Sequence, residues 1–156
     1  MPEIVSCIIE CYVFRRRADA AEFLILRRSA GSYMGDTWHP VQGRIEPRET
    51  AVQAALRELQ EETALQPVRF WHLEFVDTYF QAGHDRILLC PCFCAEVAAD
   101  APVSLSPEHT EYRWVRAAEV EAALLWPGQR RAVREILELL IPATPAEAHL
   151  RVPLRA

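Results

Sequence analysis

The segment from Gly43 to Leu65 constrains the fold of this chain more than any other part of it. Glu58, Glu61 and Glu62 stand at positions i, i+3 and i+4 within this segment. Residues at this spacing lie on one face of an α-helix, and like charges placed there repel one another and weaken the helix. An arrangement that costs stability in this way indicates a bound cation, and carboxylate oxygens favour Mg2+ or Mn2+.

The same segment carries the signals of a helix that begins after Thr50. Thr50 and Gln53 have the spacing of a capping box, in which each side chain binds the backbone NH of the other residue. At 100° per residue, one mainly aliphatic stripe is expected to face the core. Its members are Val52, Leu56, Leu59 and Thr63, and a second stripe of Ala51, Ala54 and Ala55 lies in line with the three glutamates.

Composition limits the class of protein and the kind of ligand. The chain has 156 residues, 51% of them hydrophobic and 25% charged, which is typical of one globular domain, here residues 1–156. A net charge of −5 excludes a global attraction to nucleic acid polymers or anionic membranes. A ligand that carries phosphates must therefore be held by local arginines or by metal ions.

The lack of a recognisable targeting signal and the number of cysteines indicate where in the cell the chain is expected to reside. No apolar run reaches membrane-spanning length, and Met1-Pro2-Glu3 does not resemble a secretory signal, so a cytoplasmic location is expected. Five cysteines, an odd number, argue against a disulfide framework. Cys90, Cys92 and Cys94 alternate and would share one face of a strand. Core packing is the preferred interpretation of these thiols, and a soft-metal site is the alternative.

Strand and helix signals are interspersed along the chain. Strands are expected at residues 4–14, 23–26, 38–42, 68–81, 86–97 and 112–115, the first two forming a hairpin around an exposed loop at 15–19. Pro91 implies a bulge or an edge position in its strand. Two further helices are expected at 117–125 and 128–141, followed by an irregular tail from about residue 142. This order indicates an α+β fold or an α/β/α sandwich built on a mixed β-sheet.

The glutamate segment fits a known family pattern. The run Gly43-x5-Glu49-x7-Arg57-Glu58-Leu59-x-Glu61-Glu62-x-Ala64-Leu65 resembles the Nudix box, G-x5-E-x7-R-E-U-x-E-E-x-G-U, where U is a bulky aliphatic residue. Eight of the nine specified positions match, and the resemblance implies a Nudix-type α/β/α sandwich around a mixed sheet. The exception is Ala64, which replaces a glycine just after the helix. An alanine with positive φ at this position costs about 1 kcal/mol, and the alternative is a helix that ends in another geometry.

The resemblance also implies roles for the residues of the box. Glu49 is expected to pair with Arg57 and to hold the loop against the helix, and both are grouped with Glu61 among the catalytic residues. Glu61 binds metal directly or through water. Gly43 allows the backbone to turn and offers its carbonyl region as a ligand. The expected metal-binding set is Gly43, Glu58, Glu61 and Glu62, and the expected ion is Mg2+ or Mn2+.

A second group of polar residues precedes the last expected strand. Many Nudix enzymes place an additional glutamate on such a loop, as a metal ligand or general base. Glu108 is the first candidate and Glu111 the alternative base, while a simple loop acid is an equally weighted interpretation of Glu108. His109 is a possible proton carrier, but a surface or helix-capping role is favoured.

Substrate contacts are suggested by two arginines and a tryptophan. A guanidinium at the end of a strand suits bidentate binding of phosphate, which makes Arg27 and Arg28 candidates, although either is as readily a surface charge. Trp38 is a candidate for stacking on a base, with buried packing as the slightly favoured alternative.

Within the family, the chain looks like the dATP pyrophosphohydrolase or dihydroneopterin triphosphate pyrophosphatase branch. The residues behind this likeness are Trp38-His-Pro-Val-Gln-Gly-Arg-Ile-Glu46, Glu108-His-x-x-Tyr-x-Trp114 and Gln129-Arg130-x-Ala132. The implied reaction is hydrolysis of a nucleoside or pterin triphosphate to a monophosphate and pyrophosphate. Alternatives are a dinucleoside polyphosphate or nucleotide-sugar hydrolase, a nucleotide-sensing module without activity and, most remotely, an isoprenoid diphosphate isomerase. The resemblance also makes a homodimer possible.

Overall fold

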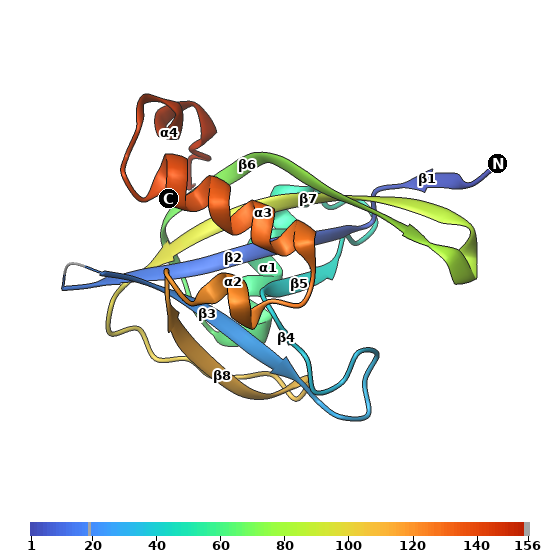
Figure 1. Cartoon of the computed structure of the whole chain (residues 1–156), viewed down its shortest axis with the longest axis horizontal. Coiled ribbons are helices and arrows are strands. Elements are labelled where there is room, and N and C mark those ends of the chain that lie inside the picture. The colour runs from blue at the N-terminus through green and yellow to red at the C-terminus, as the bar shows by residue number, and fades with distance from the viewer. Residues whose placement is uncertain (19, 155–156) are drawn as a thin grey trace.

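One mixed β-sheet forms the centre of the computed structural model, which describes residues 1–18 and 20–154 (Figure 1). The strand order is β1-β7-β2-β3-β4, and β5 pairs with β2, β6 with β7 and β8 with β3. Strand β7 runs parallel to β1 and β2, and the other pairings are antiparallel. The strands are β1 (Glu3–Val5), β2 (Ile8–Arg17), β3 (Ala20–Arg28), β4 (Trp38–His39), β5 (Val41–Arg44), β6 (Pro67–Gln81), β7 (Arg86–Val97) and β8 (His109–Arg116).

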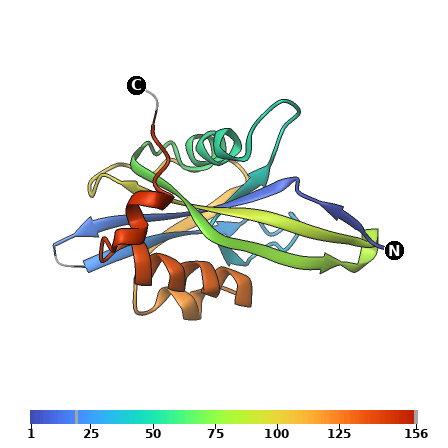
Figure 2. The ribbon, with the colours of Figure 1, turned by 90° about the horizontal axis from the view of Figure 1, so that it is seen from above.

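Helices cover both faces of the sheet, as the alternation along β2 requires. Ile9 and Cys11 pack in the cluster that contains the buried residues of α1 (Ala51–Thr63), whereas Tyr12 and Phe14 pack in the cluster beneath the C-terminal helices. Those helices are α2 (Val120–Ala123), α3 (Pro127–Glu135) and the π-helical η2 (Ile136–Leu140). Figure 2 shows α1 on one side of the sheet and these helices on the other. The expected α+β sandwich around a mixed sheet is therefore confirmed.

Helix α1 begins and ends with the expected local chemistry. The Thr50 side chain accepts a hydrogen bond from the Gln53 backbone NH, and the Gln53 side chain accepts one from the Thr50 NH at 2.8 Å. Ala64 follows the helix in the left-handed region, with φ 59°. Ala64 thus adopts the left-handed conformation that a glycine would adopt here without steric cost.

The buried side of α1 differs in part from the expected aliphatic stripe. Leu59 and Thr63 are fully buried as expected, but Val52 and Leu56 are only partly buried. The most buried residues of the first turns are instead Ala54 and Ala55. Their short side chains let the helix backbone lie close to the sheet, which rotates the contact face toward the alanines.

The first hairpin is longer than expected, and the strand that precedes it is interrupted. The expected strand at 4–14 divides into β1 and β2, and β1 pairs with β7. The expected loop at 15–19 was wrong for residues 15–17, which continue β2; Asp19 lies outside the described residues. Arg15 pairs with Glu22 across the hairpin at 2.7 Å, and Arg16 pairs with Glu96 of β7 at 3.2 Å. These cross-strand partners stabilise charged residues in a strand.

The second hairpin contains the bulge that Pro91 implies. Residues 82–84 form the short 3-10 helix η1 between β6 and β7. The register of β6 against β7 shifts between His72, opposite Phe93, and Val76, opposite Pro91. Residues 73–75 of β6 thus face the single residue Cys92 of β7, next to a proline that cannot donate a ladder hydrogen bond.

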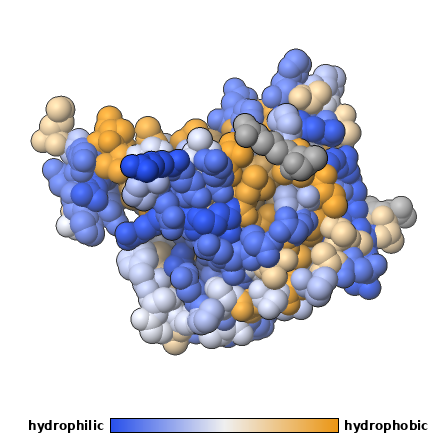
Figure 3. Space-filling model, turned by 180° about the vertical axis from the view of Figure 1, so that it is seen from behind, coloured by the Kyte–Doolittle hydropathy of each residue, from blue (hydrophilic) through white to orange (hydrophobic). Residues whose placement is uncertain are grey.

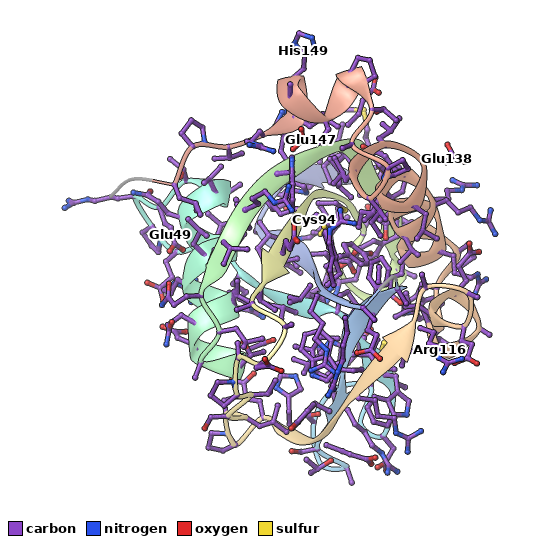
Figure 4. The ribbon with its side chains drawn as sticks, turned by 90° about the vertical axis from the view of Figure 1, so that its left-hand side faces the viewer. Glu49, Cys94, Arg116, Glu138, Glu147 and His149 are labelled. Atoms are coloured by element: carbon purple, nitrogen blue, oxygen red, sulfur yellow. The ribbon has the colours of Figure 1, made fainter. Side chains whose placement is uncertain are left out.

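The C-terminal segment is more regular than expected. Residues 145–150 form helix α4 (Pro145–Leu150), so the prediction of an irregular tail from about 142 was wrong in this part. Buried Glu147 accepts a hydrogen bond from the indole Nε1 of Trp71 at 2.6 Å and pairs with Arg151. These contacts fix α4 against β6, above the sheet in Figure 4.

The cysteines are free and pack as small apolar residues. Cys11 lies in the cluster on the α1 side of the sheet, and Cys92 and Cys94 lie in the cluster on the opposite side. Cys94 is labelled at the centre of the sheet in Figure 4. Within residues 1–18 and 20–154, no helix has the length and apolar character needed to span a membrane.

Candidate active site

An ion pair fixes the loop between β5 and α1. The Arg57 guanidinium binds Glu49 through two bonds, Nε to Oε1 at 2.9 Å and Nη2 to Oε2 at 3.0 Å. Glu49 also accepts the Glu46 backbone NH at 3.0 Å, and Arg57 donates to the Arg44 carbonyl at 2.9 Å. These hydrogen bonds, first that of Arg57, hold the pKa of Glu49 below its ordinary value. The expected Glu49–Arg57 pair is thus present, on the α1 side of the sheet (Figure 4).

Strand β5 passes directly beneath Glu58, the first candidate metal ligand of helix α1. A Cβ atom added to Gly43 would overlap the carboxyl group of Glu58. The half-buried Glu58 carboxyl has a raised pKa because burial disfavours its charge, although Arg57 opposes this shift. Gly43 therefore serves here to make room for a carboxylate.

Glu62 is the most unusual carboxylate of the site. It is only 4% exposed, and its Oε2 has no hydrogen-bond partner among the described residues. Burial, followed by the charges of Glu58 and Glu108, raises the pKa of Glu62 to about 9. An unpaired buried carboxylate oxygen with two acidic neighbours is suited to receive a positive charge.

Glu58 and Glu61 are turned toward Arg57 rather than toward a common centre. The Nη1 atom of Arg57 lies 2.8 Å from Glu58 Oε1 and 3.0 Å from Glu61 Oε2. Accordingly, in the part of the chain that the structure describes, no three His, Cys, Asp or Glu side chains stand together around one point. The donor set nevertheless suits a hard divalent ion, because it supplies oxygen ligands and the unpaired Oε2 of Glu62. Figure 3 shows that the face carrying α1 is hydrophilic over a broad area.

The loop before β8 brings Glu108 to this group. Ser104 donates its backbone NH to the Thr63 carbonyl at 2.9 Å, and Ser106 donates to the Glu62 carbonyl at 3.2 Å. The Glu108 charge raises the pKa of both Glu58 and Glu62, so Glu108 lies on the same side of the molecule as the box carboxylates.

Glu111, the alternative base, has other partners. Its Oε1 accepts two hydrogen bonds from Arg113 at 3.0 Å, and its Oε2 lies 3.4 Å from Arg27. The bond from Arg113 is the first cause that lowers the pKa of Glu111. Of the two acids, Glu108 is therefore the one that the structure brings to the box carboxylates.

The two candidate arginines differ in their surroundings. Arg27 is paired with Asp36 at 3.1 Å and with Glu111. Arg28 donates to the Gln42 side chain at 2.8 Å, and its charge acts to lower the pKa of Glu62. Arg28 is therefore the arginine that lies on the side of the carboxylates.

Trp38 is partly buried and has one face covered. The Arg113 guanidinium lies 4.4 Å above its ring. The tryptophan borders a surface hollow of about 760 Å³. The other lining residues are Ile25, Arg113, Trp114, Val115, Glu119, Ala122 and Ala123.

Sequence patterns did not reveal the role of two histidines beside the site. His39 and His109 are both buried, and their Nε2 atoms lie 3.2 Å apart. The favoured surface or capping role of His109 was therefore wrong. Burial is the first cause that lowers the pKa of His39 to about 3 and that of His109 to about 4, and the charge of Arg28 adds to both shifts. The burial of His109 was not anticipated because the expected strand began at residue 112, whereas β8 begins three residues earlier, at His109 itself.

The family of this chain is shown by its match to a known domain. The sequence model of the NUDIX domain matches residues 9–136, well over half of the chain. The chain belongs to the NUDIX domain family. It is a Nudix pyrophosphohydrolase, an enzyme that acts on a phosphoanhydride bond.

Several known proteins resemble this Nudix hydrolase. The asymmetrical bis(5'-nucleosyl)-tetraphosphatase of Sus scrofa is 35% identical over 111 residues, which cover 66% of this chain and 74% of that protein. The Rattus norvegicus protein of the same name is 34% identical over 127 residues, 80% of this chain and 84% of its own length. A solved binary complex of a C. elegans Ap4A hydrolase superposes with a TM-score of 0.75 at 23% identity, covering 88% of this chain and 98% of that one. This last likeness concerns the fold.

Proposed function

We propose that this Nudix hydrolase cleaves a dinucleoside polyphosphate asymmetrically, with Mg2+ or Mn2+ as its cofactor. Water would add to one phosphorus of a dinucleoside tetraphosphate and release a nucleoside monophosphate and a nucleoside triphosphate. The substrate class is supported by relatives from two mammals that carry this activity in their names. These relatives favour the alternative substrate over the nucleoside or pterin triphosphate that the sequence patterns first suggested.

The observation that carries the proposal is the environment of Glu62. Its buried Oε2 has no partner among the residues described, while Glu58 and Glu108 add negative charge beside it. This combination is unfavourable for the protein alone and favourable with a divalent ion. We assign Glu58 and Glu62 as ligands, with Glu61 and the Gly43 carbonyl region as further ligands. The ion would screen the charge of the phosphates and acidify a bound water.

The other residues of the box have supporting roles in this proposal. Glu49 holds Arg57 by two hydrogen bonds, and Arg57 in turn contacts Glu58 and Glu61. Arg57 thus sets the position of two carboxylates while the Glu49 pair fixes the loop above them. Both residues act on the ligands of the ion, which is why substitution of either should weaken metal use.

Glu108 is the proposed general base. Its backbone is held by hydrogen bonds beside the end of α1, and its charge acts on both Glu58 and Glu62. From there it would accept a proton from the attacking water. Glu61 is the second candidate for this role, since it is the most exposed carboxylate of the box, at 57% of its side chain.

Arg28 and Trp38 are the proposed substrate contacts. Arg28 lies on the side of Glu62 and has a guanidinium suited to phosphate. Trp38 borders the hollow beside α2, where an aromatic ring would stack with a base. Arg27 is a weaker candidate because Asp36 and Glu111 already occupy its guanidinium.

A substrate panel tests the proposal. Diadenosine tetraphosphate, dATP, dihydroneopterin triphosphate and a nucleotide sugar are each incubated with the enzyme and Mg2+ or Mn2+, and the products are separated by ion-exchange chromatography. We expect the highest kcat/KM for the tetraphosphate, with AMP and ATP as products. A preference for dATP with release of pyrophosphate would restore the first substrate class instead.

A nucleotide-sensing role is separated from catalysis by a single variant. Glu62→Gln is expected to abolish turnover while the protein still folds and binds the tetraphosphate. Tight binding by the natural protein with no turnover of any diphosphate compound would favour the sensing module.

A further inference from the structure

Two buried histidines connect the strand before the box to the turn that carries Glu108. His39 belongs to β4 and His109 begins β8, and each is at most 6% exposed. Their ring centroids are 5.1 Å apart and their Nε2 atoms 3.2 Å apart. A bond of this kind links parts of the chain that are separated by seventy positions.

The protons of this pair can be assigned from the neighbouring atoms. His39 Nδ1 lies 2.6 Å from the Pro40 carbonyl oxygen, which only accepts hydrogen bonds, so Nδ1 carries the proton. A ring nitrogen pair at 3.2 Å requires one donor and one acceptor. His39 Nε2 is therefore the acceptor, and His109 Nε2 is the donor.

An irregularity in the sheet turns His109 inward. In the pairing of β3 with β8, Arg27 stands opposite Glu111 and Arg28 opposite His109. Thr110 is thus an extra residue in β8, and the register shifts there. Such bulges redirect side chains and are frequent beside active sites. Here the bulge buries His109 and leaves Thr110 exposed.

Several hydrogen bonds hold the backbone around Glu108 in place. Its carbonyl oxygen accepts hydrogen bonds from the backbone NH and the hydroxyl of Ser29, each at 3.0 Å. The His109 backbone NH donates to Ser106, whose own NH donates to the Glu62 carbonyl. The His109 ring adds a side-chain bond to β4, and β4 leads through Pro40 into the strand that carries Gly43 beneath Glu58.

We propose that His39 and His109 are positioning residues that hold Glu108 in register with Glu58 and Glu62. This inference rests on the proposed catalytic role of Glu108. The pair joins the turn that bears Glu108 to β4, which leads into the strand that carries Gly43 beneath Glu58, so that loss of its hydrogen bond frees Glu108 to move without removing any carboxylate.

A matched pair of variants isolates the hydrogen bond. The amide nitrogen of His109→Gln occupies nearly the place of Nε2 and keeps the donor, whereas His109→Asn is polar but too short to reach His39. We expect His109→Asn to lower kcat by about 10- to 100-fold at saturating substrate and Mg2+ with little change in KM, and His109→Gln to recover most of it. His39→Asn breaks the same bond from the other ring and replaces His109→Asn if that variant fails to fold.

A double-mutant cycle with Glu108→Gln distinguishes positioning from simple core stability. If the histidine acts through Glu108, His109→Asn lowers kcat in the natural background and changes it less than about twofold in the Glu108→Gln background. Equal losses in both backgrounds would overturn the inference and leave the role of Glu108 intact. An unchanged kcat in Glu108→Gln alone would instead remove the proposed base, and the inference with it. His84→Leu, at the tip of the β6–β7 hairpin, serves as the control and should retain full kcat.

Discussion

Glu58 lies so close to Gly43 that a Cβ atom on residue 43 would overlap its carboxyl group. The glycine is needed by the side chain above it rather than by the conformation of its own backbone, since no glycine among the described residues has positive φ. The relationship explains how a box residue on a strand governs the placement of a carboxylate on the facing helix.

Gly43→Ala should therefore act as a metal-site mutation. We expect the new methyl group to displace Glu58 and to raise the Mg2+ concentration that gives half-maximal activity, with a loss in kcat of about 10-fold or more. Gly83→Ala is the matched control, because nothing lies within 4 Å of a Cβ atom there. Magnesium titrations of both variants check this, and equal Mg2+ dependence in the two would contradict the steric explanation.

Glu62 should make the metal-free protein less stable as the pH rises. Its pKa is raised from 4.5 to about 9, so the stability of the protonated form is fully present below pH 4.5 and is lost progressively as the pH rises through 9. At pH 7 the penalty is on the order of 3 kcal/mol. Glu62→Gln removes it.

Urea unfolding in EDTA at pH 5, 7 and 9 measures this effect. The free energy of unfolding of the natural protein should fall with pH relative to that of Glu62→Gln, and added Mg2+ should reduce the difference. A constant difference across this range would mean that the carboxylate is ionised throughout.

Ala64→Gly should stabilise the protein by about 1 kcal/mol, because Ala64 has a φ of 59° that only glycine adopts without steric cost. Ala148→Gly, in helix α4, is the comparison and should destabilise by roughly 0.5–1 kcal/mol. Urea denaturation of both variants provides the measurement, and a destabilised Ala64→Gly protein would count against the left-handed geometry.

Trp38→Ala should weaken substrate binding more than chemistry. Stacking of a base is worth roughly 1–3 kcal/mol, so KM for diadenosine tetraphosphate should rise by about 5- to 150-fold, while Trp38→Phe should retain much of the affinity. Phe80→Ala removes an exposed aromatic ring from β6 and should leave KM unchanged. Steady-state kinetics on the three variants decide, and an unaltered KM in Trp38→Ala would assign the tryptophan to packing alone.

The parts of the site that the sequence predicted depend on short-range spacing. The Glu49–Arg57 pair and the Thr50–Gln53 capping box join residues that lie within one loop and one helix, so the helical period was sufficient to place them. Ala64 likewise follows the helix where the pattern requires a left-handed residue.

The parts that the sequence did not predict depend on sheet register. The His39–His109 bond and the hydrogen bond from the Ser29 hydroxyl to the Glu108 carbonyl both require the pairing of β3 with β8. A bulge in that pairing decides which side chain turns inward. Alternation alone does not show where an extra residue enters a strand. The strand position of Arg16 escaped prediction for a related reason, because its partner Glu96 belongs to a strand far along the chain.

The central claim is that Glu58 and Glu62 hold a divalent ion against the phosphates of the substrate. Its most direct test is titration of Mn2+ into the natural protein, Glu58→Gln and Glu62→Gln, followed by electron paramagnetic resonance of the free ion, with diadenosine tetraphosphate turnover measured on the same samples. We expect the natural protein to bind Mn2+ and cleave the substrate, and both variants to lose affinity for the ion and turnover together. Natural Mn2+ affinity and undiminished turnover in both variants would contradict the claim.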